Sequence, residues 1–352
     1  MFFNAPGGNV LIKEPQTEFL TGVVLSGAHG IYDVHTDIGI LRCTLRGKLK
    51  KAFARAQAEQ AAGKGRPQSN KQLKLPKSLR EAEQVTQLTR LAVGDYVRVR
   101  RLDEKNGLIE EILPRQSALT RKDAASTEKR AIQQTMLANL DQVALVFAVA
   151  QPEPHFGMLD RYLAICESAQ IPPIICLNKA DLPHEPYVDE AAQLYSSLGY
   201  KVIWTSAKTG QGIDILREQL KAHTTLFTGP SGVGKSSLVN AIEPGMAIKT
   251  GMVSDATGKG RHTTTGSKLY PLSSGGWLAD SAGIRALATW DIAPEELADC
   301  FVEFHPYLGD CEYNDCEHLE EEGCAIRQAV EEGKINERRY RSYVRMVTGE
   351  ER

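Results

Sequence analysis

The stretch GPSGVGKSS at residues 229–237 decides the fold, because it fits the phosphate-loop pattern G-x-x-x-x-G-K-[ST]. An apolar run, TTLFTG at 224–229, precedes it, and a helix-like run, KSSLVNAIE at 235–243, follows it. In that order of strand, glycine-rich loop and helix, backbone N–H groups and the helix N-terminus both point at a phosphate. The pattern therefore predicts an α/β domain that binds the phosphates of a nucleotide.

Two side chains of this loop have individual expected roles. Lys235 is expected to bridge the β- and γ-phosphates and to assist catalysis by neutralising their charge, and the hydroxyl group of Ser236 is expected to ligate Mg²⁺. The residues expected to contact the phosphates are Gly229, Pro230, Ser231, Gly232, Val233, Gly234, Lys235, Ser236 and Ser237.

The stretch CLNKADL at 176–182 predicts that the base is guanine. Asp181 can accept hydrogen bonds from guanine N1 and from the exocyclic N2, whereas adenine offers no such pair of donors. Asn178 and Lys179 are expected to brace the loop and to flank the ring. A weaker match, TSAK, predicts a second loop against the base, with the residues Ser206, Ala207 and Lys208.

Two further elements follow the phosphate loop. LADSAG contains D-x-x-G, in which Asp280 is expected to hold Mg²⁺ through water and the Gly283 N–H to sense the γ-phosphate. The run HTTT at 262–265 supplies a threonine that is expected to close over Mg²⁺, and we favour Thr264. These matches together predict a Mg²⁺-dependent GTPase.

The usual water-orienting residue is missing from this chain. Ras-like enzymes carry a glutamine after D-x-x-G, but here that position is Ile284, which cannot orient water. His262, just before the threonines, is the candidate replacement; the alternative is an exposed loop histidine. We therefore expect slow intrinsic hydrolysis that a docked partner stimulates.

Strand and helix patterns divide the chain into three regions. Short β-type runs from about Thr21 to Gln116 predict a five-stranded barrel of the OB-fold type. From about Asp141 to Leu287, apolar strands alternate with amphipathic helices, which predicts a mainly parallel sheet covered on both faces. From Ala293 the chain is expected to be helical. The predicted domains are 1–117, 118–290 and 291–352, with a basic insertion in the barrel at about 46–90.

The insertion has a one-sided charge. Between Arg46 and Arg80 there are eleven Lys or Arg residues and a single acid, Glu59, although the whole chain has a net charge of −2. Two readings remain open: a solvated loop, or an arm that seeks RNA phosphates. A second expected RNA-binding surface is the arginine-rich tail, with Arg338, Arg339, Arg341 and Arg345.

The cysteines predict a metal site. The stretch CEYNDCEHLEEEGC at 311–324 offers three thiolates and an imidazole, which is enough for one structural Zn²⁺. The alternative is a set of reduced cysteines in a loop-rich region. The expected ligands are Cys311, Cys316, His318 and Cys324; the cysteines expected merely to be packed are Cys43, Cys166, Cys176 and Cys300.

Cellular location is inferred from cysteine usage and from the N-terminus. Seven cysteines with this clustering fit a reducing compartment, and the N-terminal residues show no secretory signal pattern. The longest apolar stretch, Val143 to Ala150, is too short to cross a bilayer. We therefore expect a cytoplasmic protein without a membrane partner.

The order of the motifs is unusual: base loop first, phosphate loop later. Joining the end of the series to its start restores the usual order, so the sequence predicts a circularly permuted GTPase core. In this order the loop after Gly283 runs directly into the C-terminal region, so a γ-phosphate-dependent shift there is expected to pull on that region.

At this point the chain resembles the small-ribosomal-subunit-dependent GTPase A (RsgA, YjeQ) family, in IEEILPRQSALTRKD, LDRYL, GPSGVGKSSLVN, HTTT and the terminal cysteine block. The resemblance implies a monomer that binds the 30S subunit and 16S rRNA late in maturation and is released when GTP is hydrolysed to GDP. Two alternatives remain open: a nucleotide-gated RNA-binding scaffold with incidental hydrolysis, and a signalling GTPase with protein partners only.

Overall fold

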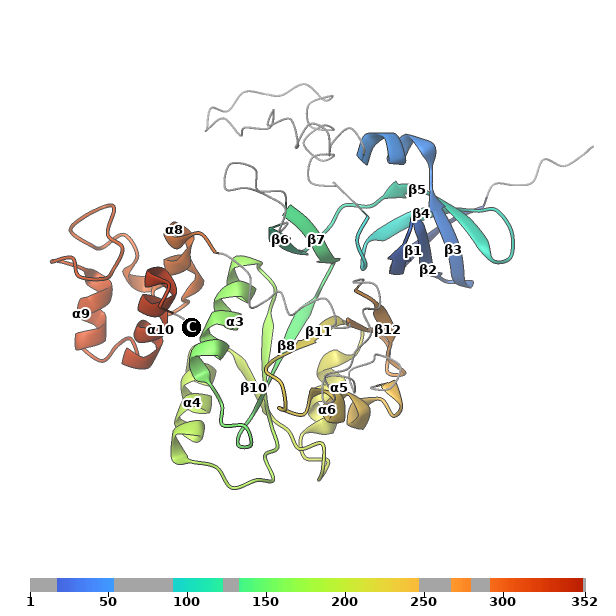
Figure 1. Ribbon diagram of the computed structural model, residues 1–352. Coiled ribbons are helices and arrows are strands. Elements are labelled where there is room, and N and C mark those ends of the chain that lie inside the picture. The colour runs from blue at the N-terminus through green and yellow to red at the C-terminus, as the bar shows by residue number, and fades with distance from the viewer. Residues whose placement is uncertain (1–17, 54–90, 123–132, 247–266, 280–291, 351–352) are drawn as a thin grey trace, which may run out of the picture.

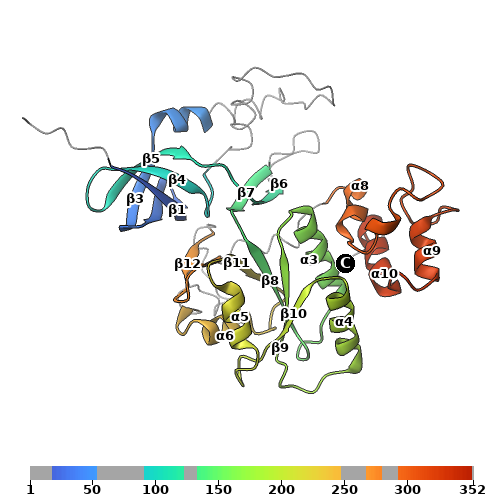
Figure 2. The same ribbon diagram turned by 180° about the vertical axis from the view of Figure 1, so that it is seen from behind.

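The computed structural model describes residues 18–53, 91–122, 133–246, 267–279 and 292–350. These residues form a small barrel, a central sheet covered by helices, and a C-terminal helical module (Figure 1). The barrel and the module lie on opposite sides of the central sheet in both views (Figures 1 and 2). The central region therefore carries two separate attachments.

The barrel has the five strands that the sequence predicts, closed in the order β1-β2-β3-β5-β4. Alternation of inward and outward residues explains it: in β3 every second side chain, such as Leu41 and Cys43, is buried, and the residues between them are exposed. Helical residues 47–53 begin the basic insertion, and its remainder lies outside the described residues. The strands are β1 (Phe19–Ala28), β2 (Ile31–Thr36), β3 (Gly39–Leu45), β4 (Tyr96–Arg101) and β5 (Asn106–Ile112).

A two-stranded antiparallel ribbon, β6 (Ala118–Lys122) and β7 (Gln133–Ala138), joins the barrel to the central sheet. The sequence patterns did not predict it. Leu119 and Leu137 are buried in the core of the central region, and Leu137 also bridges Val93, next to the barrel. The ribbon is thus a connector whose apolar side belongs to the central core.

The central sheet has the order β10-β9-β8-β11-β13-β12, parallel throughout except for β12. Helices α3 and α4 cover one face, and α5 and α6 cover the other, as the alternating pattern predicts. The strands are β8 (Gln142–Ala148), β9 (Pro173–Asn178), β10 (Lys201–Trp204), β11 (Thr224–Thr228), β12 (Leu269–Pro271) and β13 (Trp277–Ala279). The helices are α3 (Phe156–Ser168), α4 (Pro186–Ser197), α5 (Ile213–Leu220) and α6 (Lys235–Ile242).

This strand order explains how a permuted sequence keeps its site. Strand β11, which leads into the phosphate loop, lies between β8 and β13, so the block of early strands β8–β10 meets the block of late strands β11–β13 at the β8–β11 pair. Because β8, β9, β10, β11 and β13 are parallel, their carboxyl ends meet at one edge of the sheet. Ligands of such sheets bind beyond that edge.

The C-terminal module packs on α3 through a core that includes Phe301, Phe304 and Tyr343. The sequence predicts helix through residues 295–304, but the helical structure ends at Cys300. Phe301 is extended, with φ −108° and ψ 98°, and its ring is fully buried. The elements are α8 (Pro294–Leu297), the 3-10 turns η4 (Ala298–Cys300) and η5 (His305–Tyr307), α9 (Ala325–Glu331) and α10 (Glu337–Thr348). Among the helices described, none is long and apolar enough to cross a membrane.

Candidate functional site

The phosphate loop turns sharply between β11 and α6. Gly229 has φ +146°, and a Cβ atom there would lie 2.0 Å from the carbonyl oxygen of Val146 in the neighbouring strand. Gly234, with φ +90°, is the residue just before α6, and a Cβ atom there would lie 2.5 Å from Asn178 Nδ2. Only glycine fits these two close approaches. The loop therefore lies directly against the strands that flank it.

Lys235 is folded back over this loop. Its Nζ donates hydrogen bonds to the carbonyl oxygens of Gly229 at 2.9 Å and of Pro230 at 2.6 Å. The residue is also the first of α6, so the charge of the side chain lies above the positive end of a helix dipole. An ammonium group over a helix N-terminus forms an anion-binding centre.

The base loop and the phosphate loop are in direct contact. Asn178, which is 1% exposed, donates from Nδ2 to the Val233 carbonyl at 2.8 Å. Lys179 donates from Nζ to the Gly232 carbonyl at 2.8 Å. Two motifs predicted from widely separated stretches are thus joined by hydrogen bonds from Asn178 and Lys179 to the phosphate loop.

Asp181 belongs to the base loop, and its side chain faces the TSAK loop. Its carboxylate accepts a hydrogen bond from Ser206 Oγ at 2.6 Å and lies 3.7 Å from Lys208 Nζ. The Ser206 hydroxyl group and, more weakly, the Lys208 ammonium hold the pKa of Asp181 below its ordinary value. Asp181 is therefore an anion at neutral pH, and Ser206 occupies only part of its hydrogen-bonding capacity.

The TSAK loop is fixed by backbone contacts. The Ala180 N–H donates to the Thr205 carbonyl at 3.0 Å, and the Ser206 N–H donates to the Gln211 carbonyl at 2.9 Å. Ser206 is fully buried, whereas the Lys208 side chain is 81% exposed. Ala207, between them, is half-buried. Ser206 and Lys208 thus lie beside Asp181, and Ala207 is the residue between them in the sequence.

Several predicted site residues lie outside the described residues: His262, Thr263, Thr264, Thr265, Asp280, Gly283 and Ile284. The described strand β13 ends at Ala279, one residue before Asp280, and lies parallel to β11. The chain therefore enters the D-x-x-G stretch from the same edge of the sheet as the phosphate loop.

Two residues of the site were missed by sequence reasoning. The Gln151 carbonyl, in the loop after β8, accepts a hydrogen bond from Lys179 Nζ. Thr205 donates from Oγ1 to Asn178 Oδ1 at 3.3 Å and is fully buried. Thr205 is the first residue of TSAK and could have been found from that motif, whereas no local pattern marks Gln151.

The four predicted metal ligands come together. The ligand atoms of Cys311, Cys316, His318 and Cys324 all lie within 4.8 Å of one another. Zinc–sulfur bonds of about 2.3 Å in a tetrahedron place sulfur atoms roughly 3.8 Å apart, so only small movements are needed to close a site. Three thiols and an imidazole are soft and borderline ligands, which suit zinc better than magnesium or calcium.

The surroundings of these ligands are consistent with a metal site. Burial raises the pKa of the Cys316 thiol to about 12 and raises that of Cys324 above its ordinary value. A bound cation reverses this effect, because a coordinating thiol is deprotonated. Helix α10 stabilises the loop that carries the four residues through two hydrogen bonds. Tyr340 Oη donates to the His318 carbonyl and Tyr343 Oη donates to the Glu317 carbonyl, both at 2.8 Å.

The C-terminal module is joined to α3 by a buried charge network. Asp160 of α3 is fully buried and accepts hydrogen bonds from Tyr195 Oη at 2.7 Å, Arg339 Nη1 at 2.8 Å and Ser342 Oγ at 2.6 Å. Arg339 also donates from Nε to Glu303 at 2.6 Å. Arg339 is 1% exposed, so it does not belong to the RNA-binding surface expected for the arginine-rich tail.

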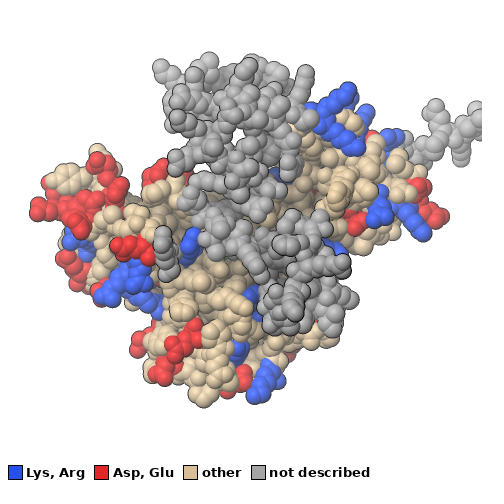
Figure 3. Space-filling model, viewed as in Figure 1, with Lys and Arg blue, Asp and Glu red and all other residues tan. Residues whose placement is uncertain are grey.

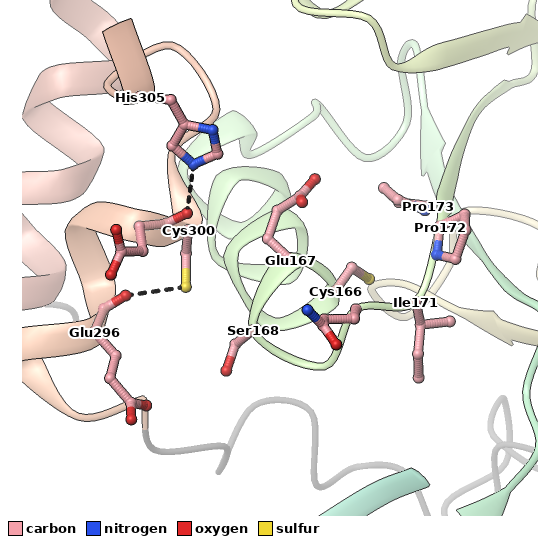
Figure 4. Close-up of a pocket in the computed structure, with 11 residues that line it drawn as sticks. Cys166, Glu167, Ser168, Ile171, Pro172, Pro173, Glu296, Cys300 and His305 are labelled. Atoms are coloured by element: carbon pink, nitrogen blue, oxygen red, sulfur yellow. Dashed lines mark hydrogen bonds between the residues drawn. The ribbon is translucent and has the colours of Figure 1, made fainter. Parts of the chain in front are cut away.

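A cavity of about 620 Å³ lies between the end of α3 and the α8–η4 turn (Figure 4). Pro172, which precedes β9, and Pro173, its first residue, line the cavity. It therefore lies at the amino edge of the sheet, opposite the nucleotide loops. Two of its lining residues are cysteines, and burial raises the pKa of Cys300 to about 12 and that of Cys166 further. Protonated thiols are poor nucleophiles, so these cysteines do not make the cavity a reactive site.

The four cysteines outside the cluster are packed in apolar cores, as the sequence predicts. They are Cys43, Cys166, Cys176 and Cys300.

The chain is similar to known GTPases over most of its length. Residues 112–290 match the family model described as RsgA GTPase. The protein named small ribosomal subunit biogenesis GTPase RsgA of Gemmatimonas aurantiaca is 40% identical over 336 residues, which is 94% of this chain and 97% of that protein. The protein of the same name in Caldanaerobacter subterraneus is 36% identical, and the match covers 94% of this chain and 95% of that protein.

Solved structures agree with this similarity. YjeQ from Thermotoga maritima has a TM-score of 0.69 and 31% identity, with 94% of this chain and 98% of that chain covered. YloQ, described as a circularly permuted GTPase, has a TM-score of 0.64 and 28% identity. The match covers 94% of this chain and 95% of the YloQ chain. Both similarities extend over barrel, sheet and C-terminal module together.

Proposed function

This chain belongs to the RsgA GTPase family and is a GTPase, and on that premise we propose that it acts in maturation of the small (30S) ribosomal subunit. It binds 16S rRNA there and leaves when GTP is hydrolysed. The observation that carries the nucleotide part of the proposal is the contact between base loop and phosphate loop, through Asn178 and Val233. The subunit part rests on the names of the relatives.

The proposed GTP contacts follow from the geometry. Guanine lies against Asp181, whose ionised carboxylate accepts from N1 and N2, while Ser206 keeps the carboxylate oriented. Lys235 exchanges its two carbonyl partners for the β- and γ-phosphate oxygens. An ammonium group already placed over the loop needs little reorganisation when phosphate arrives, which favours binding.

Hydrolysis needs charge neutralisation and an oriented water molecule. We propose that Ser236 and Thr264 hold Mg²⁺, which neutralises the phosphate charge when bound, with Asp280 acting through water. His262 is the proposed water-orienting residue, since Ile284 cannot serve. Because a loop histidine needs a partner to position it, the isolated protein turns over slowly and the subunit accelerates it.

The module is proposed to hold one structural Zn²⁺ on Cys311, Cys316, His318 and Cys324, in support of which the four ligand atoms cluster within 4.8 Å. Replacing Cys316 by alanine should abolish stoichiometric zinc and expose the module to protease, because structural zinc contributes about 10–16 kcal/mol in small metal-dependent modules. The matched control is Cys300→Ala, a buried cysteine outside the cluster. Full zinc content in Cys316→Ala would contradict the assignment.

The remaining proposals concern organisation. Domains of 1–117, 118–290 and 291–352 are supported by apolar clusters centred on the barrel, the sheet and the module. The clusters meet at the boundaries, since one sheet cluster includes Val23 and Leu25 of β1 and the module cluster includes Ala164 of α3. We also propose that the protein is a monomer, as the family resemblance implies. All seven cysteines are free thiols, which favours a reducing, cytoplasmic setting.

The test is single-turnover GTP hydrolysis by the full-length protein, with and without purified 30S subunits. We expect stimulation of roughly a hundredfold or more, which is modest for partner-assisted GTPases. Large ribosomal subunits serve as the control for non-specific RNA. Fast hydrolysis without 30S subunits, or equal stimulation by both subunits, would contradict the proposal.

The rival function, a nucleotide-gated scaffold with incidental hydrolysis, predicts a different release step. If hydrolysis drives release, the protein stays on 30S subunits with a non-hydrolysable GTP analogue and leaves with GTP. A scaffold leaves equally fast with both nucleotides. A sedimentation assay of bound protein distinguishes the two.

A further inference from the structure

A groove of about 980 Å³ lies between α3, α4 and α10. None of the residues assigned above to GTP or to the metal lines it. Basic side chains gather over α10 in the space-filling view, whereas acidic side chains predominate at the neighbouring metal-binding end of the module (Figure 3). The groove therefore combines a hollow with a local positive charge.

The basic side of the groove consists of four arginines. Arg338, Arg341 and Arg345 are spaced by three and four residues along α10, which places them on one face of the helix, and Arg161 of α3 lines the groove with them. Two acids, Glu190 and Glu350, also line it, so the arginines outnumber the acids by two. This excess favours an anionic occupant.

Arg338 is held in a fixed position. Its guanidinium group lies over the ring of Phe156, 4.7 Å from the centroid, and over that of Tyr195, at 5.4 Å. Its Nε and Nη2 are buried and have no hydrogen-bond partner among the described residues. An arginine that stacks on aromatic rings and has two unpaired N–H groups is preorganised for an anion that brings acceptors with it.

The other side of the groove is aromatic. Tyr187 of α4 is 38% exposed and meets the edge of Phe156 at a centroid distance of 6.0 Å. Exposed aromatic rings beside arginines suit nucleobases, which stack on the rings while their phosphates pair with the cations. A double helix keeps its bases stacked inside, so this contact requires a single strand.

We propose that this groove binds a single-stranded RNA segment, with phosphates on Arg338 and Arg341 and one base on Tyr187. The inference rests on the proposed function in that a ribosomal particle supplies the RNA. Helix α10, which lines the groove, and the barrel lie on opposite sides of the central sheet in both ribbon views, so the proposed contact is separate from the barrel (Figures 1 and 2).

The test uses the full-length protein and a fluorescent ten-nucleotide oligouridylate carrying one 4-thiouridine. In the double variant Arg338→Gln, Arg341→Gln, affinity should fall about tenfold, and the slope of log affinity against log salt should decrease by about 1.4 for two lost phosphate contacts. The matched double variant Lys201→Gln, Lys221→Gln removes the same charge from exposed positions elsewhere and should bind normally.

The base contact has a separate readout. Tyr187→Ala should lower affinity about tenfold without changing the salt slope, and Tyr187→Phe should retain affinity, because stacking needs the ring and not the hydroxyl group. Photo-cross-linking through 4-thiouridine should label the peptide that contains Tyr187. Unchanged melting temperatures and basal GTP hydrolysis show that each variant is folded.

Three outcomes would overturn the inference. The first is normal RNA affinity in the arginine double variant, and the second is the absence of a cross-link to α4 or α10. The third is that polyglutamate competes as strongly as unlabelled RNA, which would indicate an acidic protein partner. Failure of the proposed function is recognised separately, because the unmodified protein then shows no stimulation by 30S subunits.

Discussion

Two aspartates of the central domain have opposite surroundings. Asp160 is fully buried and accepts hydrogen bonds from Tyr195, Arg339 and Ser342, so the protein itself satisfies the carboxylate. Asp181 has one close donor, the Ser206 hydroxyl group, and a more distant, exposed lysine. The difference shows which carboxylate is structural and which is free for a ligand, since hydrogen-bonding capacity that the fold leaves unused can bind substrate.

The largest expected effect is on base preference. Asp181→Asn replaces an acceptor of the guanine N–H groups by an amide that can donate, so GTP affinity should fall by about three orders of magnitude. Affinity for xanthosine triphosphate, which carries a carbonyl in place of the N2 amino group, should rise. Competition binding with both nucleotides measures the change. Retained GTP preference would mean that Asp181 does not contact the base.

Asp160 should behave in the opposite way. Asp160→Asn removes the charge that Arg339 faces in the interior, so unfolding free energy should fall by about 3 kcal/mol while the preference for GTP stays unchanged. Chemical denaturation measures the first quantity and competition binding the second. Asp189→Asn, at an exposed carboxylate of α4, is the matched control. A shift in base preference would contradict the distinction between the two aspartates.

A smaller effect should follow from removing one donor of Asp160. Tyr195→Phe deletes the hydroxyl group that lies 2.7 Å from Asp160 and keeps the ring under Arg338. Because two donors remain, the expected loss is about 1 kcal/mol of unfolding free energy. Thermal denaturation measures it, with the exposed Tyr313→Phe as control. A loss as large as that of Asp160→Asn would mean that the carboxylate depends on the tyrosine rather than on the arginine.

The smallest expected effect concerns pH. The Ser206 hydroxyl group is the main cause of the lowered pKa of Asp181, so Ser206→Ala should raise that pKa toward its ordinary value. A carboxylate with a lowered pKa stays ionised as the pH falls until the pH reaches that pKa. GTP binding by the variant should therefore weaken at a higher pH than binding by the unmodified protein, with an affinity several-fold lower at neutral pH. Identical pH profiles would exclude Ser206 as the cause.

Local patterns predicted much of the site. GPSGVGKSS, NKAD and TSAK lie at the ends of apolar strands, and parallel strands bring their carboxyl ends together, so the contact between base loop and phosphate loop follows from topology. The three cysteines and the histidine that cluster within 4.8 Å come from one short stretch, and their grouping was also predictable. In both cases the relevant information is local in the sequence.

The joint between α3 and α10 was not predictable in this way. In LDRYL, Asp160 reads as a polar residue of an amphipathic helix, and Arg339 reads as part of a basic tail. Their pairing joins residues separated by 179 positions, and no periodicity records such a contact. The β6–β7 ribbon was missed for a related reason, because its strands are short and their apolar residues serve the core of another region.

The network around Asp160 has a consequence for protein engineering. Its members come from α3, α4, α10 and the segment that contains Glu303. A chimera that takes its C-terminal module from one relative and its sheet from another inherits position 160 from one parent and positions 303 and 339 from the other. Unless positions 160, 303 and 339 are transferred as a matched set, the hybrid will contain an ion without a counter-ion in its interior, and it will fail for that reason rather than for want of sequence similarity.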